Sequence, residues 1–239
     1  LQMHLIGEAY YPGFLRRNYI NAYRYCLHER AKSMLIEAGA QTNTFEEVKK
    51  ASKLIRWYGF NLGHQMMVGL PDSTRIDEIN TAKELIKLRP KMVRIYPVLV
   101  IKNTRLEKEY LEGKYTPLTV VQAVETCKEL VSMFNQKGID VIRVGLQNTD
   151  EITDPNIEGS EVVAGPYHPA FRQLVEANLW YDDILKRIKE MNTKVKRVKI
   201  IINPKDVNNV VGHKRERDQE KLSKLNTEMR EAYSQIMSN

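Results

Sequence analysis

Cysteine is scarce in this sequence: Cys26 and Cys127 are the only two among 239 residues. They lie far apart and neither belongs to a Cys-x-x-Cys pair, so zinc-type ligand spacing is excluded. Cys127 shares an apolar helical stripe with Val124, Leu130 and Val131, and this pattern predicts a buried thiol. A thiol in such surroundings stays protonated and inert.

Long hydrophobic runs are also missing. No apolar stretch approaches the ~20 residues that a membrane-spanning helix needs, so we do not expect a membrane protein. The first residues, LQMHLIGEAYYPGF, do not place a basic segment before an apolar core, as a signal peptide would. We therefore expect a cytoplasmic location.

The residues that are present have the composition of an ordinary globular protein with an excess of basic groups. Hydrophobic residues make up 42% and charged residues 28%, which is typical of soluble domains. The formal net charge of +7 is compatible with a nucleic-acid or nucleotide partner. Many enzymes of neutral substrates are equally basic, so charge alone leaves a nucleic-acid partner open.

The most informative stretch runs from His64 to Thr104. An apolar run at 65–70 ends in Gly69-Leu70-Pro71-Asp72, a helical pattern capped by Ser73 follows, and a second apolar run covers 93–101. Strand, turn, helix and strand in this order predict a βαβ unit with parallel strands. Parallel α/β folds bind ligands at the carboxyl ends of strands, so residues 69–72 and 100–104 form the expected working face.

Strands and helices alternate along the rest of the chain as well. Thr44 and Glu47 form a capping box that predicts a helix to Gly59, and Pro117 opens another helix that ends at Gly138. We further expect strands at 4–8, 140–147 and 196–203, a long loop at 148–169, and helical segments at 14–38, 170–192, 204–212 and 214–237. This alternation predicts a parallel sheet or barrel.

Polar side chains alternate along the second strand of the βαβ unit. Arg94, Tyr96 and Lys102 are spaced by even numbers, so they should share one face of that strand. Inside a barrel they would line the cavity and hold an anion; the alternative is a salt-bridged strand end. Arg143 and Gln147, also spaced by an even number, would extend this lining toward a substrate if the strands align.

His168 is a further substrate-lining candidate, because it stands between structure-breaking residues in GPYHP at 165–169. Near the mouth of a cavity its imidazole would serve as a proton donor. The alternative is a hydrogen bond that only orders the loop.

Four segments together resemble a known family. They read QMMVGLP at 65–71, VRIYPVLVIKNT at 93–104, IDVIRVGLQ at 139–147 and VVAGPYHPAFRQLVE at 162–176. The resemblance is to bacterial radical S-adenosylmethionine (radical SAM) proteins related to the catalytic subunit of Elongator. It implies an α/β fold: an incomplete TIM-type parallel barrel over residues 1–147, then a loop, helix, strand and charged helical extension over 148–239.

The same resemblance implies cofactors. In this family a Cys-x3-Cys-x2-Cys loop holds a 4Fe-4S cluster, which binds S-adenosylmethionine (SAM) and cleaves it to a 5′-deoxyadenosyl radical. This sequence has no such loop, so we expect neither the cluster nor another metal site on the chain. We expect a weak SAM site formed by Gln41, Gln65, Gly69, Pro71, Arg94, Tyr96 and Lys102.

For two of these residues a role other than SAM binding is open. Gln65 either contacts the ribose or carboxylate of SAM, or is an interior glutamine that bonds its neighbours. Gln41 resembles a strand-end glutamine that touches the ribose, but the family segment that should follow it is shortened here.

Two functions compete. The first is a radical SAM enzyme that cleaves SAM reductively and acts on tRNA or another nucleic acid, by analogy with the Elongator relative. The second is a non-catalytic remnant barrel that serves as a binding or assembly module. An incomplete barrel exposes sheet edges, so we also expect self-association or a partner chain.

Overall fold

A computed structural model describes residues 44–191 and 200–211 of the protein. The chain forms two compact units, residues 1–51 and 52–239. The described part of the first unit is the start of helix α2 (Phe45–Trp57), which continues into the second unit. The predicted capping box is confirmed, because the Glu47 carboxylate accepts a hydrogen bond from the Thr44 N–H at 2.7 Å.

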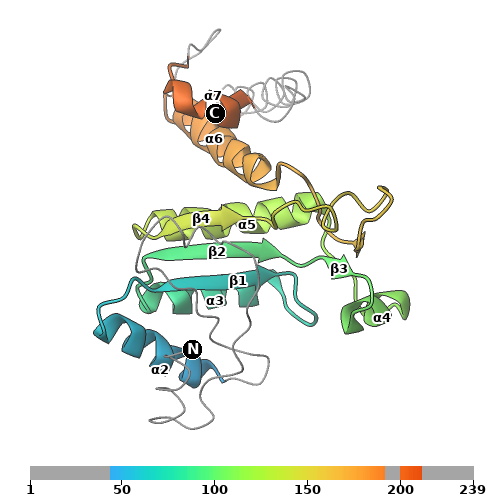
Figure 1. The fold of residues 1–239 in the computed structure, drawn as a ribbon. Helices are drawn as coiled ribbons and strands as arrows, with labels where there is room; N and C mark the ends of the chain where they lie inside the picture. The colour runs from blue at the N-terminus through green and yellow to red at the C-terminus, as the bar shows by residue number, and fades with distance from the viewer. Residues whose placement is uncertain (1–43, 192–199, 212–239) are drawn as a thin grey trace, which may run out of the picture. The chain divides into compact units, whose positions relative to one another are not determined.

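Three parallel strands form the main sheet of the second unit, in the order β1–β2–β4 (Figure 1). They are β1 (Gly63–Val68), β2 (Met92–Pro97) and β4 (Asp140–Val144). Helix α3 (Arg75–Lys87) connects β1 with β2, so the predicted βαβ unit is confirmed.

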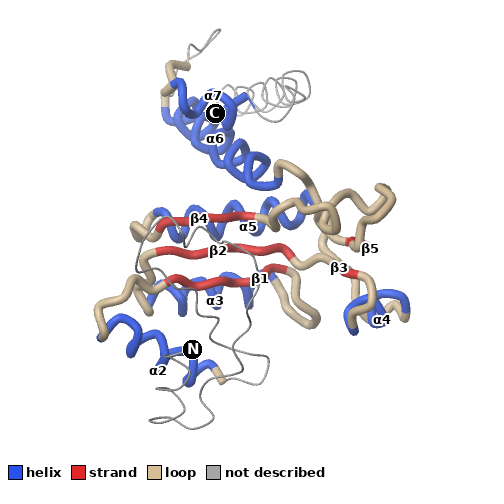
Figure 2. Tube along the Cα trace, in the orientation of Figure 1, coloured by secondary structure: helices blue, strands red, loops and turns tan. Residues whose placement is uncertain are grey.

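Helices α3 and α5 (Val120–Asn135) lie together on one face of this sheet (Figure 2). The first turn of each is held by a threonine hydroxyl that accepts a hydrogen bond from a helix N–H: Thr74 caps α3 and Thr119 caps α5. The prediction that Ser73 caps α3 is wrong, because Asp77 completes a capping box with Thr74 instead.

The apolar core lies between the sheet and these two helices. Buried residues alternate with more exposed ones along β2, as period-2 strands require when one face is covered. The fully buried members include Val68, Val93, Ile95, Cys127, Leu130, Val131 and Phe134. The predicted burial of Cys127 is thus confirmed.

The single strand predicted at 93–101 is two strands in the structure. β2 ends at Pro97, which has no N–H to donate to a neighbouring strand. β3 (Val100–Ile101) then pairs antiparallel with β5 (Val162–Ala164), which interrupts the predicted loop. Helix α4 (Arg105–Leu111), which the sequence analysis did not predict, follows β3 and is capped by Thr104.

The C-terminal helices largely follow the prediction. Helix α6 (Phe171–Glu190) packs against α5, and the turn at 204–212 consists of η2 (Pro204–Asp206) and α7 (Val207–Val211). The strand predicted at 196–203 is wrong for residues 200–203, where the Asn203 side chain accepts from the Lys205 N–H and starts the turn. The predictions for 4–8, 14–38, 192–199 and 214–237 lie outside the described residues.

No helix within residues 44–191 and 200–211 is both long and apolar enough to cross a lipid bilayer. The division of the chain at residues 147 and 148 stays a prediction.

Candidate functional site

One face of the main sheet carries polar and sulfur-containing side chains. Because α3 and α5 cover the face that holds Met66, Val68, Val93 and Ile95, the alternate residues of each strand point to the opposite side. We call this opposite side the open face; its residues are Gln65, Met67, Met92, Arg94, Tyr96 and Arg143. All six are exposed or half-buried.

A row of three polar side chains crosses the open face. Gln65 on β1 is paired with Arg94 on β2, and Arg94 is paired with Arg143 on β4. Neighbouring strands lie about 4.8 Å apart, so the side chains of this row are adjacent. A bulge between Val93 and Arg94 shifts the register and brings Arg143 to this position.

The two arginines of this row are adjacent like charges. Neither guanidinium makes a hydrogen bond or an ion pair with another of the described residues. Like charges opposite each other on a sheet repel, whereas a bound carboxylate or phosphate would satisfy both through charge-assisted hydrogen bonds. The row is therefore suited to an anion.

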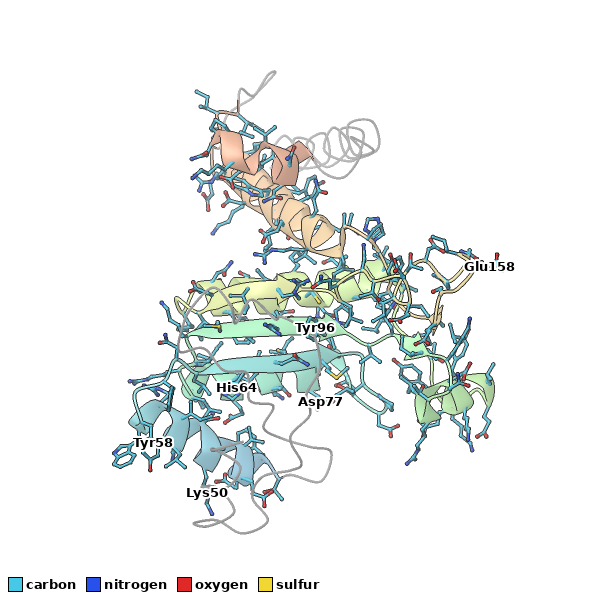
Figure 3. The ribbon with its side chains drawn as sticks, in the orientation of Figure 1. Lys50, Tyr58, His64, Asp77, Tyr96 and Glu158 are labelled. Carbon is cyan, nitrogen blue, oxygen red and sulfur yellow. The ribbon has the colours of Figure 1, made fainter. Side chains whose placement is uncertain are left out.

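Tyr96 extends the row toward the carboxyl ends of the strands. It pairs with Met67 on β1 and lies one alternate position beyond Arg94 (labelled in Figure 3). The structure thus brings together Gln65, Arg94, Tyr96 and Arg143 from the predicted site. The apolar Met67 beside the phenol provides a surface on which a flat, partly apolar group can rest.

Two predicted residues lie elsewhere. Lys102 does not share the strand of Arg94, because β2 ends at Pro97 and Lys102 follows β3 in the second sheet. Its ammonium donates a hydrogen bond to the Ser160 carbonyl oxygen at 2.5 Å. Gln147 is exposed beyond the end of β4 and does not continue the strand.

Three further predicted residues are His168, Pro71 and Gln41. His168 orders the start of α6, because its Nδ1 accepts a hydrogen bond from the Ala170 N–H at 3.0 Å. Pro71 is exposed in the turn after β1, and Gln41 lies outside the described residues. A ligand role for any of these three stays a prediction.

Gly69, also predicted, is held by two side chains that the sequence analysis did not single out. Its N–H donates to Glu78 Oε1 at 2.5 Å, and its carbonyl oxygen accepts from the Tyr115 hydroxyl at 2.6 Å. Burial raises the pKa of Glu78, an effect that the hydrogen bond from Gly69 partly opposes. A signal for Glu78 was present in its helical spacing with Ala82 and Leu85, which are buried on the same helix.

Cys127 is the single cysteine in the described residues, and it is fully buried on α5. Burial raises the pKa of its thiol far above the usual range. Within residues 44–191 and 200–211, no group of three or more histidine, cysteine, aspartate or glutamate side chains is arranged to hold a metal ion.

We expect Cys127 to resist thiol reagents in the folded protein and to react once the protein is unfolded, since only the thiolate attacks the reagent. Labelling with a maleimide, followed by peptide mapping, distinguishes it from Cys26. Rapid modification of the Cys127 peptide without denaturant would contradict the buried placement.

Comparisons with known proteins agree with the sequence resemblance. Residues 90–181 match the family model of the Radical_SAM C-terminal domain. A second model, that of Stage II sporulation protein P (SpoIIP), matches residues 1–56, most of which lie outside the described residues.

Curated relatives also match part of this chain. A tRNA uridine(34) acetyltransferase of Methanocaldococcus jannaschii is 30% identical over 122 residues, which cover 42% of this chain and 23% of that protein. One from Dehalococcoides mccartyi is 30% identical over 86 residues, covering 35% of this chain and 18% of that protein. This chain therefore spans less than a quarter of the curated relatives it matches.

A solved structure of Methanocaldococcus infernus Elp3, with residues 1–46 deleted, also matches. The identity is 23% and the TM-score 0.46, over 61% of this chain and 31% of that one.

Proposed function

Because this chain is an Elongator-related radical SAM protein, we propose that it contributes part of a TIM-type barrel to a tRNA-modifying enzyme and binds SAM on its open face. The observation that carries the proposal is the row of Gln65, Arg94 and Arg143 beside Tyr96. In the parallel α/β folds, ligands bind at the ends of such strands.

The donor groups of the open face fit SAM. Its methionine carboxylate is an anion, for which a guanidinium is the preferred partner. Its ribose hydroxyls can bond the Gln65 amide, and its adenine can rest against the ring of Tyr96 and the thioether of Met67. These side chains would bind and orient the cofactor.

The 4Fe-4S cluster of the parent family does not fit the residues of this chain. Such clusters need several thiolates converging on one small site, and the sequence holds two cysteines. Cys127 is buried in the apolar core with a raised pKa, so its thiolate is not accessible as a ligand. The proposal therefore covers cofactor binding and assigns no electron-transfer step to this chain.

A tRNA substrate is proposed from the relatives. Three of them are named tRNA uridine(34) acetyltransferase, and the net charge of +7 is compatible with a polyanionic partner. The tRNA part of the proposal rests on analogy with these relatives, because the matched segments cover a minor part of each of them.

Completion of the barrel by another polypeptide belongs to the same proposal. In the described residues, β1 and β4 each pair with one neighbour, β2. Strand edges of this kind accept further strands through backbone hydrogen bonds. We propose that a partner chain or a second copy supplies them.

Isothermal titration calorimetry with SAM tests the ligand assignment. We expect weak, measurable binding, and we expect Arg94→Gln to weaken it by about tenfold, since a hydrogen bond to a charged group contributes about 1.5–3 kcal/mol. 5′-Methylthioadenosine, which lacks the amino-acid part, should bind the wild type and Arg94→Gln equally.

Arg105→Gln is the matched control, because Arg105 is an exposed arginine on α4 that pairs with Glu109. It should bind SAM as the wild type does. An absence of heat and of thermal stabilisation at millimolar SAM would refute the proposed site, and so would equal affinities for Arg94→Gln and the wild type.

A further inference from the structure

The turn that follows β1 contains two residues with positive φ. Gly69 adopts φ of +84°, and a Cβ added there would lie 3.0 Å from a side-chain carbon of Leu118. Asp72 also has a positive φ, of +59°. Glycine adopts such a conformation readily, whereas a side-chain-bearing residue such as Asp72 adopts it seldom and keeps it where surrounding contacts hold the turn.

Those surrounding contacts come from two separate elements. Glu78, on α3, accepts the hydrogen bond of the Gly69 N–H, and Tyr115, after α4, donates to the Gly69 carbonyl oxygen. The two side chains are only 5% and 7% exposed. Both backbone polar groups of one residue are thus satisfied by buried side chains, which are 9 and 46 positions away in the sequence.

Tyr115 also joins the turn to the second sheet. Its ring packs with Val98 and Val100, the residues through which the chain passes from β2 to β3. The same tyrosine therefore contacts the carboxyl end of β1 through its hydroxyl and the chain after β2 through its ring. The ends of these two strands flank the open face where Met67 pairs with Tyr96.

We propose that Glu78 and Tyr115 are positioning residues that fix the Gly69–Asp72 turn and, through it, the end of the open face where the ligand binds. The ligand part rests on the proposed function. A turn that is already ordered loses little conformational freedom on binding, and this raises affinity without any direct contact. The carboxylate suits this role because a charged acceptor strengthens its hydrogen bond with the Gly69 N–H.

Hydrogen–deuterium exchange of the full chain tests the proposal. Tyr115→Phe removes only the hydroxyl, and loss of one hydrogen bond should accelerate exchange in peptides that contain the turn by roughly fivefold. Amides at the centre of β1 should exchange as in the wild type. Glu78→Ala should act in the same direction, and Glu78→Gln, which keeps an acceptor oxygen, should restore slow exchange.

Tyr110→Phe is the matched control. Tyr110 packs against the same small cluster as Tyr115, and its hydroxyl makes no hydrogen bond with another of the described residues. Unchanged exchange of the turn in Tyr115→Phe, or equal acceleration in Tyr110→Phe, would overturn the proposal.

The affinity for SAM, measured on the same variants, separates the two proposals. A roughly fivefold weaker affinity in Tyr115→Phe, with faster exchange of the turn, supports both. If Tyr115→Phe exchanges faster but the wild type does not bind SAM, the result supports the ordering of the turn by Glu78 and Tyr115 and refutes the proposed function. Faster exchange with an unchanged affinity for SAM would overturn the positioning role.

Discussion

Phe134→Ala is expected to lower the free energy of unfolding by about 3–5 kcal/mol, because it removes a large side chain from a packed interior. Phe134 is fully buried on α5, between that helix and the main sheet. Its neighbours belong to regular elements and can close only part of the cavity. A loss of this size is a large fraction of the 5–15 kcal/mol that typical domains possess.

Urea unfolding followed by circular dichroism measures this loss. Val121→Ala is the control on the same helix, since the Val121 side chain is 73% exposed and should change the free energy of unfolding by less than about 0.5 kcal/mol. A loss below about 1 kcal/mol for Phe134→Ala would be typical of a solvent-exposed position and would contradict the placement of α5 against the sheet.

The strands and helices of the main layer could be predicted from the sequence because their patterns are regular. Buried residues recur every second position in β2, and α5 places Val124, Cys127, Leu130 and Val131 on one side. β5 has three residues and α4 has seven, and neither is long enough to show such a period. Their positions depend on contacts with β3, which is distant in sequence from β5.

The candidate site was only partly predictable for a similar reason. Period-2 spacing correctly placed Arg94 and Tyr96 on one face. That Arg143 stands beside Arg94 depends on the bulge in the β2–β4 pairing, which no local pattern reveals. The error at Lys102 arose because the period was continued past Pro97, where the strand ends.

The two hydrogen bonds that Glu78 and Tyr115 form with Gly69 could not be predicted from the sequence. Tyr115 is 46 positions from the glycine whose carbonyl it bonds, so no spacing rule connects them. Glu78 occupies a core-facing position on α3, and the sequence analysis did not single it out. A buried carboxylate must find a hydrogen-bond donor, and only the fold shows that this donor is a backbone N–H in the turn after β1.

Gly145→Ala is expected to lower the free energy of unfolding by about 2–4 kcal/mol, because strain and overlap add at this position. Gly145 follows β4 with φ of +82°, which disfavours a side chain. A Cβ there would also lie 3.0 Å from Cβ and 3.3 Å from Cγ of Phe171, the buried first residue of α6. The Phe171 Cβ is attached to the helix backbone, so α6 itself would have to move.

Gly138→Ala separates the two causes, because Gly138 precedes the same strand with φ of +66° and, apart from its chain neighbours, no atom of the described residues would lie within 4 Å of an added Cβ. It should cost only the strain of the left-handed conformation, about 1–2 kcal/mol. Urea unfolding of both variants gives the difference, which is the cost of the overlap between the added methyl group at residue 145 and Phe171. Equal losses in the two variants would show that α6 does not pack on the end of β4 as closely as the structure places it.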